Sequence, residues 1–110
     1  MGITKSEIFS TKQNEIANFA KVLGNPARVA ILQQIMKRES CICGDLATEI
    51  GLSQPTISQH LKELKSIGLI KGNIQGVKIC YCIDQDNWNK MKALLTEFFN
   101  QNSNLQNECC

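Results

Sequence analysis

The sequence predicts one mainly α-helical domain that carries a small β-hairpin, in the order α-α-α-α-β-β-α. Three observations predict this fold class. Apolar residues recur at helical spacing, caps and glycines divide that pattern into short segments, and two β-rich runs lie between residues 69 and 83. A chain of 110 residues has room for one hydrophobic core. We therefore expect one domain over residues 1–100 and a flexible tail with two cysteines over residues 101–110.

Asn25 and Pro26 separate the first two predicted helices, because asparagine caps helix N-termini and proline suits the first helical position. The first helix is expected to end at Gly24, and the second to run from Pro26 to about Arg38. Their apolar positions are Ile8, Ile16, Phe19, Ala20 and Leu23 in the first helix, and Val29, Leu32, Ile35 and Met36 in the second.

A sharp turn at Gly51 is predicted to join a third and a fourth helix. Asp45 caps the third helix, and Gly51 suits its end because abrupt helix ends favour a left-handed residue. The fourth helix begins at Ser53 and ends near Gly68. The inward-facing positions are Leu46, Ala47 and Ile50 in the third helix, and Ile57, Leu61 and Leu64 in the fourth. Two helices joined in this way form a helix-turn-helix.

The β-rich runs 69–74 and 77–83 predict a hairpin with Gln75 and Gly76 at its turn. A final helix is expected after Asp84, with one apolar stripe formed by Trp88, Met91, Leu95 and Phe98. A hairpin that follows a helix-turn-helix makes the predicted fold a winged helix-turn-helix.

The fourth helix has the polar face expected of a helix that reads double-stranded DNA. Glutamine bonds adenine through two contacts, serine and threonine accept several bases, and lysine suits phosphates. Residues 54–78 carry a net charge of +3, against +2 for the whole chain. The candidate DNA contacts are Ser53, Gln54, Thr56, Ser58, Gln59, His60, Lys62, Lys65 and Lys78. A solvated polar helix is the alternative, and His60 equally suits a packing position.

The six cysteines form three pairs: Cys41 with Cys43, Cys80 with Cys82, and Cys109 with Cys110. In an extended segment, residues two apart share a face, so such a pair is able to chelate one soft ion. In a helix the same residues point roughly 200° apart. Chelation by Cys41 and Cys43 therefore requires the segment before Asp45 to be extended or irregular, and this short segment could instead open the next helix. The alternative for the first two pairs is that their thiols are core residues.

Two runs of the sequence resemble the ArsR/SmtB winged-helix repressors. The run from Leu23 to Leu32 is similar to the second-helix signature of that family, and the run from Ser53 to Leu61, followed by Leu64 and residues 68–70, is similar to its recognition helix. The resemblance covers about residues 19–98. It implies a homodimeric repressor that leaves its operator when a metal or metalloid binds. It also implies that the terminal helices form the dimer interface, here Ile16, Phe19, Leu23, Trp88, Met91, Leu95 and Phe98.

Cys41-Ile42-Cys43 resembles the Cys-Val-Cys-Asp-Leu thiol box of arsenical-responsive members, although Gly44 intervenes before Asp45. Thiolates select soft species such as Cu(I), Zn(II), As(III) or Sb(III). The resemblance, together with a last helix that has no histidine for a zinc site of the zinc-sensing relatives, puts As(III) and Sb(III) ahead of Zn(II) and Cu(I), and we expect no other cofactor. The ligand candidates, in falling order, are Cys41, Cys43, Cys109, Cys110, Cys80 and Cys82. Pairing of the segment before the third helix with the last wing strand would gather the first two pairs.

Three other functions compete with a metalloid-responsive repressor. The cysteines of the same DNA-binding protein could instead form a redox or persulfide switch. A thiol enzyme is disfavoured, because no Cys-x-x-Cys precedes a helix, and a winged helix that binds only protein would show no salt-dependent DNA affinity. The sequence has no signal-peptide pattern and no apolar run of membrane-spanning length. We therefore expect a cytoplasmic protein without a membrane partner.

Overall fold

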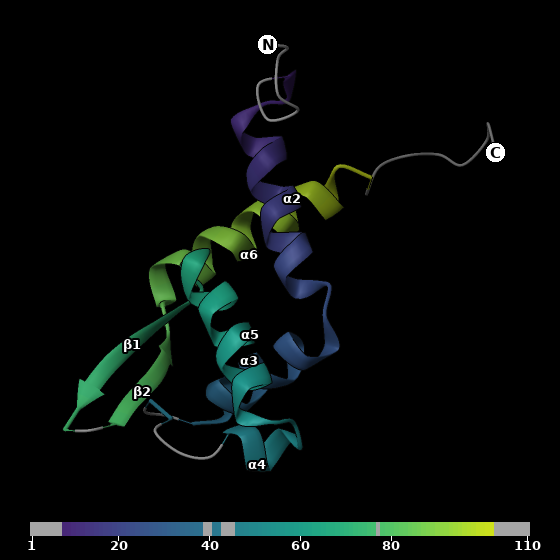
Figure 1. The fold of residues 1–110 in the computed structure, drawn as a ribbon. Coiled ribbons are helices and arrows are strands. Elements are labelled where there is room, and N and C mark those ends of the chain that lie inside the picture. Colours follow the sequence, from purple (N-terminus) through teal and green to yellow (C-terminus); the bar gives the residue numbers. More distant parts are fainter. Residues whose placement is uncertain (1–7, 39–40, 43–45, 77, 103–110) are drawn as a thin grey trace, which may run out of the picture.

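The structure is a computed structural model that describes residues 8–38, 41–42, 46–76 and 78–102. Its elements follow the predicted order: α2 (Thr11–Leu23), α3 (Pro26–Lys37), α4 (Leu46–Ile50), α5 (Gln54–Ser66), β1 (Ile70–Gln75), β2 (Lys78–Ile83) and α6 (Gln85–Asn100). Figure 1 shows α2 crossing α6 at one end of the molecule, with the hairpin and α4 toward the other. The predicted winged helix-turn-helix fold is confirmed.

The first two helices begin at side-chain caps. Ser10 and Gln13 form a reciprocal capping box at the start of α2, and Asn25 Oδ1 accepts hydrogen bonds from the backbone of Ala27 and Arg28. The prediction that Ile8 belongs to the apolar face of this helix is wrong. Ile8 precedes the Ser10 cap and is 64% exposed.

The buried face of α3 differs from the predicted one. Leu32 and Ile35 are buried as expected, but Ile31 is also fully buried, whereas Val29 is 38% and Met36 46% exposed. Both sets satisfy helical spacing, so the sequence pattern alone does not choose between them. The choice follows from the position of α3, which packs against α2, α4, α5 and β2.

The helix-turn-helix closes as predicted. Gly51 adopts a φ of +87°, and the backbone N–H groups of Gly51 and Leu52 both donate to the carbonyl of Ala47. Ser53 then caps α5 through its side-chain oxygen, which accepts from the backbone N–H of Thr56. The buried side chains of α5 are Ile57, Leu61 and Leu64, as predicted. The opposite face of α5 is thereby turned to solvent.

The wing is an antiparallel hairpin whose register pairs Ile70 with Ile83 and Gln75 with Lys78. The predicted turn at Gln75 and Gly76 is therefore wrong by one residue, because Gln75 is the last residue of β1 and Gly76 opens the turn with a φ of +64°. On its other side, β2 forms an isolated antiparallel bridge between Ile42 and Tyr81. The predicted pairing of the segment before α4 with the last wing strand is confirmed.

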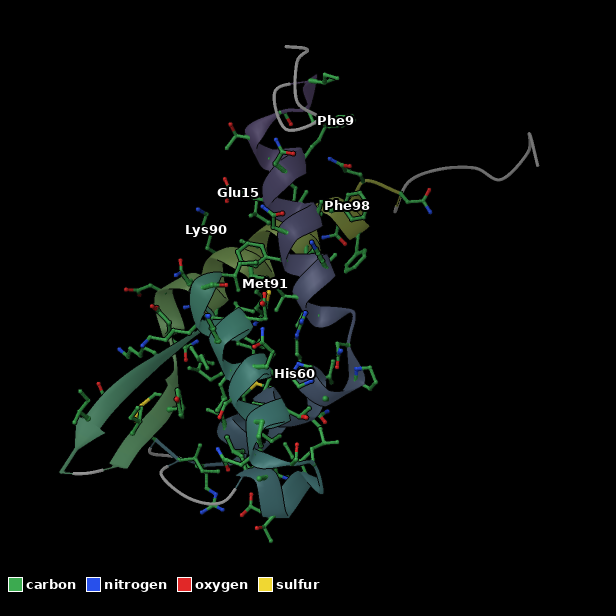
Figure 2. The ribbon with its side chains drawn as sticks, in the orientation of Figure 1. Phe9, Glu15, His60, Lys90, Met91 and Phe98 are labelled. Atoms are coloured by element: carbon green, nitrogen blue, oxygen red, sulfur yellow. A yellow bond between two sulfur atoms is a disulfide. The ribbon has the colours of Figure 1, made fainter. Side chains whose placement is uncertain are left out.

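Helices α2 and α6 pack together at the end opposite α4. Ion pairs of 2.9 Å join Lys12 to Glu97 and Glu15 to Lys90. Glu15 and Lys90 are labelled in Figure 2. Phe19 and Met91, two of the residues expected at the dimer interface, are buried within the core of a single chain. Phe98 is 49% exposed and lies at the same end of the molecule as Phe9 (Figure 2). Within the described residues, no helix is long and apolar enough to cross a membrane.

Candidate nucleic-acid interface and thiol site

The exposed side of α5 carries nearly all the residues predicted to contact DNA. Ser53, Gln54 and Thr56 lie at the N-terminal end of the helix, and Ser58, Gln59 and Lys62 follow along its exposed side. The first-turn N–H groups and the positive end of the helix dipole lie at this end, where negative charge is stabilised. The arrangement offers hydrogen-bonding groups at the helix end and a cation further along it.

Hydrogen bonds between side chains order this surface. Gln54 Nε2 donates to Ser58 Oγ at 3.3 Å, and the hydroxyls of Ser53 and Thr56 lie 2.9 Å apart. Gln59 Nε2 donates to a carboxylate oxygen of Glu63 at 3.4 Å. These contacts hold the polar groups in a row while leaving them accessible to solvent. DNA contact by these residues stays a prediction.

His60 differs from the other candidates because it faces another helix. The side chain is half-buried, and its Nδ1 accepts a hydrogen bond of 3.3 Å from Arg28 Nε in α3. Arg28 also donates to the backbone carbonyl of Val22. The geometry therefore gives His60 a role in positioning α5 against α3 (Figure 2). A DNA contact through its other ring nitrogen stays a prediction.

Of the remaining basic candidates, Lys65 is exposed near the end of α5, whereas Lys78 is described only through its backbone at the start of β2. The structure adds Lys71, an exposed residue of β1 that contributes to the net charge of residues 54–78 but was not among the predicted DNA contacts. The structure places Lys71 on the wing beside the end of α5, and this proximity to the recognition helix is what makes it a candidate DNA contact. A lysine on a predicted wing strand is a candidate for phosphate contact.

A hollow of about 320 Å³ separates the start of α5 from the wing. Gln54 and Ser58 line it from α5, and Ile79 and Tyr81 line it from β2. Neither Ile79 nor Tyr81 was among the predicted site residues, and an isoleucine in a strand is ordinarily a core residue. Ile79 is instead 52% exposed. The hollow places the wing beside the predicted base-reading residues.

The structure brings Cys41 and Cys82 together as a disulfide. Ile42 and Tyr81 exchange both backbone hydrogen bonds, at 2.9 and 2.8 Å, so residues 41 and 82 form the adjacent, closer pair of an antiparallel ladder. Their Cα atoms are 4.4 Å apart, within the range that a disulfide spans. The segment between α3 and α4, which from the sequence could be extended or could open the next helix, is thus extended at Ile42.

Two more described residues belong to the surroundings of this disulfide. Asn73 Nδ2 donates to Cys41 Sγ at 3.6 Å and to Cys82 Sγ at 3.5 Å. Cys80 is fully buried and is also disulfide-bonded. Among the described residues no group of three or more metal-ligating side chains gathers. The other predicted ligands, Cys43, Cys109 and Cys110, lie outside the described residues.

Comparisons with known proteins agree with this architecture. Residues 25–71 match the family described as "Bacterial regulatory protein, arsR family". The chain is 31% identical to the arsenical resistance operon repressor of Staphylococcus xylosus, over 84% of this chain and 81% of that protein. It is 30% identical to the nodulation protein NolR of Rhizobium meliloti, over 84% and 75%. The crystal structure of NolR from Sinorhizobium fredii superposes with a TM-score of 0.62 at 32% identity, over 90% and 97%.

Fold and exposed helix together define a winged helix-turn-helix DNA-binding protein. More narrowly, the chain belongs to the ArsR family of bacterial regulatory proteins. It is a transcriptional regulator and not an enzyme.

Proposed function

We propose that this protein is a homodimeric repressor that binds operator DNA through α5 and the wing, and whose release from DNA is controlled at Cys41 and Cys82. The observation that carries the proposal is the convergence of these two cysteines across the Ile42–Tyr81 bridge. One cysteine precedes the helix-turn-helix and the other belongs to the wing. A chemical change at this pair therefore acts on both DNA-binding elements.

The face of β2 opposite the cysteines supports this coupling. Because side chains alternate along a strand, Tyr81 points away from its neighbours Cys80 and Cys82. Tyr81 lines the hollow that also contains Gln54 and Ser58 of α5. A shift of the Ile42–Tyr81 bridge would therefore move Tyr81 relative to the recognition helix. An effector that favours the DNA-free arrangement weakens DNA binding by the same factor, typically about 1–3 kcal/mol of coupling.

The effector we propose first is a thiophilic ion, with As(III) and Sb(III) ahead of Zn(II) and Cu(I). In the reduced protein Cys41 and Cys82 supply two soft donors side by side. A third thiolate would come from Cys43, Cys80, Cys109 or Cys110. A chain segment of about ten residues spans roughly 18 Å when it behaves as a random coil, so the predicted tail would be long enough to supply that ligand. The similarity to an arsenical resistance operon repressor favours this candidate.

Oxidation is the second candidate, and the Cys41–Cys82 disulfide itself favours it. In this case an oxidant or a persulfide converts the dithiol to a cross-linked form, and no ion is required. The cross-link would fix the segment before α4 to the wing strand. Release from DNA would then follow the oxidation state of this pair.

The test is fluorescence anisotropy of the fully reduced protein on a duplex from its own promoter, titrated separately with arsenite, zinc, a persulfide donor and an oxidant. Release by arsenite without oxygen supports the ion, and release by oxidant alone supports the disulfide. Cys41→Ser and Cys82→Ser should bind DNA but lose the response. The control is the double variant Cys109→Ser, Cys110→Ser, which loses the arsenite response only if the tail supplies the third thiolate.

The DNA-binding half of the proposal has its own test. Gln54→Ala and Ser58→Ala should weaken binding to the operator by about 1–3 kcal/mol each, while leaving the cysteine chemistry unchanged. Unaltered sequence preference in both variants would rule out the assigned recognition face. A reduced protein that ignores duplexes from its promoter contradicts the whole proposal.

A further inference from the structure

A second hollow borders the disulfide, and none of its described lining residues belongs to the recognition helix. It has a volume of about 300 Å³ and lies between the end of α3, β2 and the start of α6. Cys41 and Cys82 line it, Ile35 and Trp88 contribute apolar walls, and Gln85 and Arg38 contribute polar groups. The two bonded sulfurs are therefore reached from a confined space.

The charge in this hollow favours an anion. Among the described residues that line it, Arg38 alone carries a formal charge. Its guanidinium is half-exposed and donates to Glu49 of α4 at 2.9 Å. A guanidinium has five N–H donors, so this contact leaves others for a second carboxylate. The hollow thus combines a disulfide with an anion-binding group.

We propose that this hollow is a docking site for a small thiol that bears a carboxylate, and that such a thiol reduces the Cys41–Cys82 disulfide there. Arg38 pairs with the carboxylate, and the apolar walls hold the carbon chain against the sulfurs. The site rests on the oxidative candidate under the proposed function, since it adds the reductant that resets the switch.

The exchange balances with two thiols. The thiolate of the first attacks one sulfur of the disulfide, forms a mixed disulfide with that cysteine and releases the other cysteine as a thiolate. A second thiolate then attacks the small-molecule sulfur of the mixed disulfide. The products are one small-molecule disulfide and two reduced cysteines, so two electrons pass from the two thiols to the protein.

Docking at Arg38 also has a consequence for the helix-turn-helix. Glu49 belongs to α4, the first of its two helices. A carboxylate ligand on the remaining donors would share the charge of the guanidinium with Glu49 and so weaken the contact between the end of α3 and α4. Arg38 therefore both selects the reductant and contacts α4 of the helix-turn-helix.

The test compares three reductants on the oxidised full-length protein: 3-mercaptopropionate, neutral 2-mercaptoethanol and cationic cysteamine. Samples are quenched by alkylation, and reduction is read at Cys41 and Cys82 by peptide mass spectrometry. The rate with 3-mercaptopropionate is divided by the rate with 2-mercaptoethanol in each variant, which cancels their intrinsic reactivities. Arg38→Gln should lower this ratio about threefold, the size of effect that one half-exposed ion pair provides.

Two further variants sharpen the result. Lys37→Gln removes a neighbouring charge that does not line the hollow, and its ratio should equal that of the wild type. Glu49→Gln removes the competing carboxylate and should raise the ratio, which also tests the site should Arg38→Gln fail to fold. In the wild type, cysteamine should show no comparable advantage over the neutral thiol.

Equal ratios in the wild type, Arg38→Gln and Glu49→Gln overturn the docking site, as does a failure of Cys41 and Cys82 to form a disulfide. The proposed regulation is judged separately by anisotropy. Charge-selective reduction in a protein whose DNA affinity ignores its oxidation state would support the docking site and contradict the oxidative control of DNA binding.

Discussion

The side-chain amide of Asn73 contacts both sulfurs of the Cys41–Cys82 pair, although it comes from the neighbouring strand β1. In the reduced protein an N–H donor in this place stabilises a thiolate, which is the reactive form of cysteine. A carboxylate in the same place would repel that charge. Asn73 therefore adjusts the reactivity of the thiol site from within the wing.

We predict that Asn73→Asp slows alkylation of Cys41 and Cys82 by iodoacetamide about fivefold or more at neutral pH, since the loss of one hydrogen bond of about 1 kcal/mol alone changes a rate about fivefold and the new charge also opposes the thiolate. The rate is measured on the reduced protein by peptide mass spectrometry. Asn73→Ala should give a smaller effect of the same sign. Equal rates in all three proteins would show that the amide does not act on the sulfurs.

Lys62 is the exposed cation on the recognition helix that best suits a phosphate. Lys62→Ala should weaken binding to all duplexes alike and reduce the slope of log affinity against log salt by about 1, because one fewer counterion is released. Affinities are measured at several salt concentrations. Lys92→Ala, an exposed lysine on α6, is the matched control and should leave the slope unchanged.

The junction between α5 and the wing depends on Gly68, which has a φ of +82°. A Cβ at this position would collide with the side-chain amide of Asn87 in α6, whose Nδ2 donates to the Gly68 carbonyl at 3.0 Å. The backbone conformation therefore opposes a larger residue, and an added Cβ would displace the end of the Asn87 side chain and break its hydrogen bond to Gly68. This contact fixes the wing and α6 relative to the recognition helix.

Gly68→Ala should lower the free energy of unfolding by about 2–3 kcal/mol, since it combines left-handed backbone strain with the loss of space for Asn87. Gly76→Ala is the matched control, because Gly76 also has a positive φ but no atom lies within 4 Å of an added Cβ. That variant should lose only about 1 kcal/mol. Urea denaturation measures both values, and equal losses would contradict the role of the clash.

The elements themselves were predictable from the sequence because they depend on local signals. Asn25-Pro26 and Ser53 begin helices through contacts within four residues, and Gly51 ends one through its own φ. Which side of α3 faces the core was not predictable, since a face that includes Val29 and one that includes Ile31 both satisfy helical periodicity. The position of neighbouring elements decides which of them is buried.

In the candidate site, too, features set by local signals were predictable from the sequence, and features set by tertiary contacts were not. The exposed row on α5 was predictable, because one apolar stripe determines the opposite face. The disulfide between Cys41 and Cys82 joins residues 41 positions apart, and its pairing depends on strand register. Asn73 and Arg38 carried no sequence signal of their own, since each acquires its place beside the sulfurs only through the fold.

At the scale of the whole molecule, the end formed by α2 and α6 leaves a set of apolar side chains exposed: Ile8, Phe9, Phe98 and Phe99. Phe98 and Phe99 contact each other with ring centroids 5.6 Å apart. Burying such surface in a symmetric dimer is favourable, because each large apolar side chain contributes about 1.5–3 kcal/mol when removed from water. The proposed dimer therefore relies on Phe98 more than on Phe19 or Met91, which the single chain already buries.

Phe98→Glu should raise the dimer dissociation constant about tenfold or more without unfolding the chain, because it places charge on an interface outside the monomer core. Sedimentation over a range of concentrations measures the dimer, and circular dichroism measures the fold. Ile79→Glu is the matched control for dimer strength and fold only, since Ile79 is similarly exposed but lies on the wing, where a new charge would act on DNA binding directly. Operator affinity should fall with the dimer in Phe98→Glu, because two recognition helices bind one symmetric site together. A dimer of unchanged strength would place the subunit interface elsewhere.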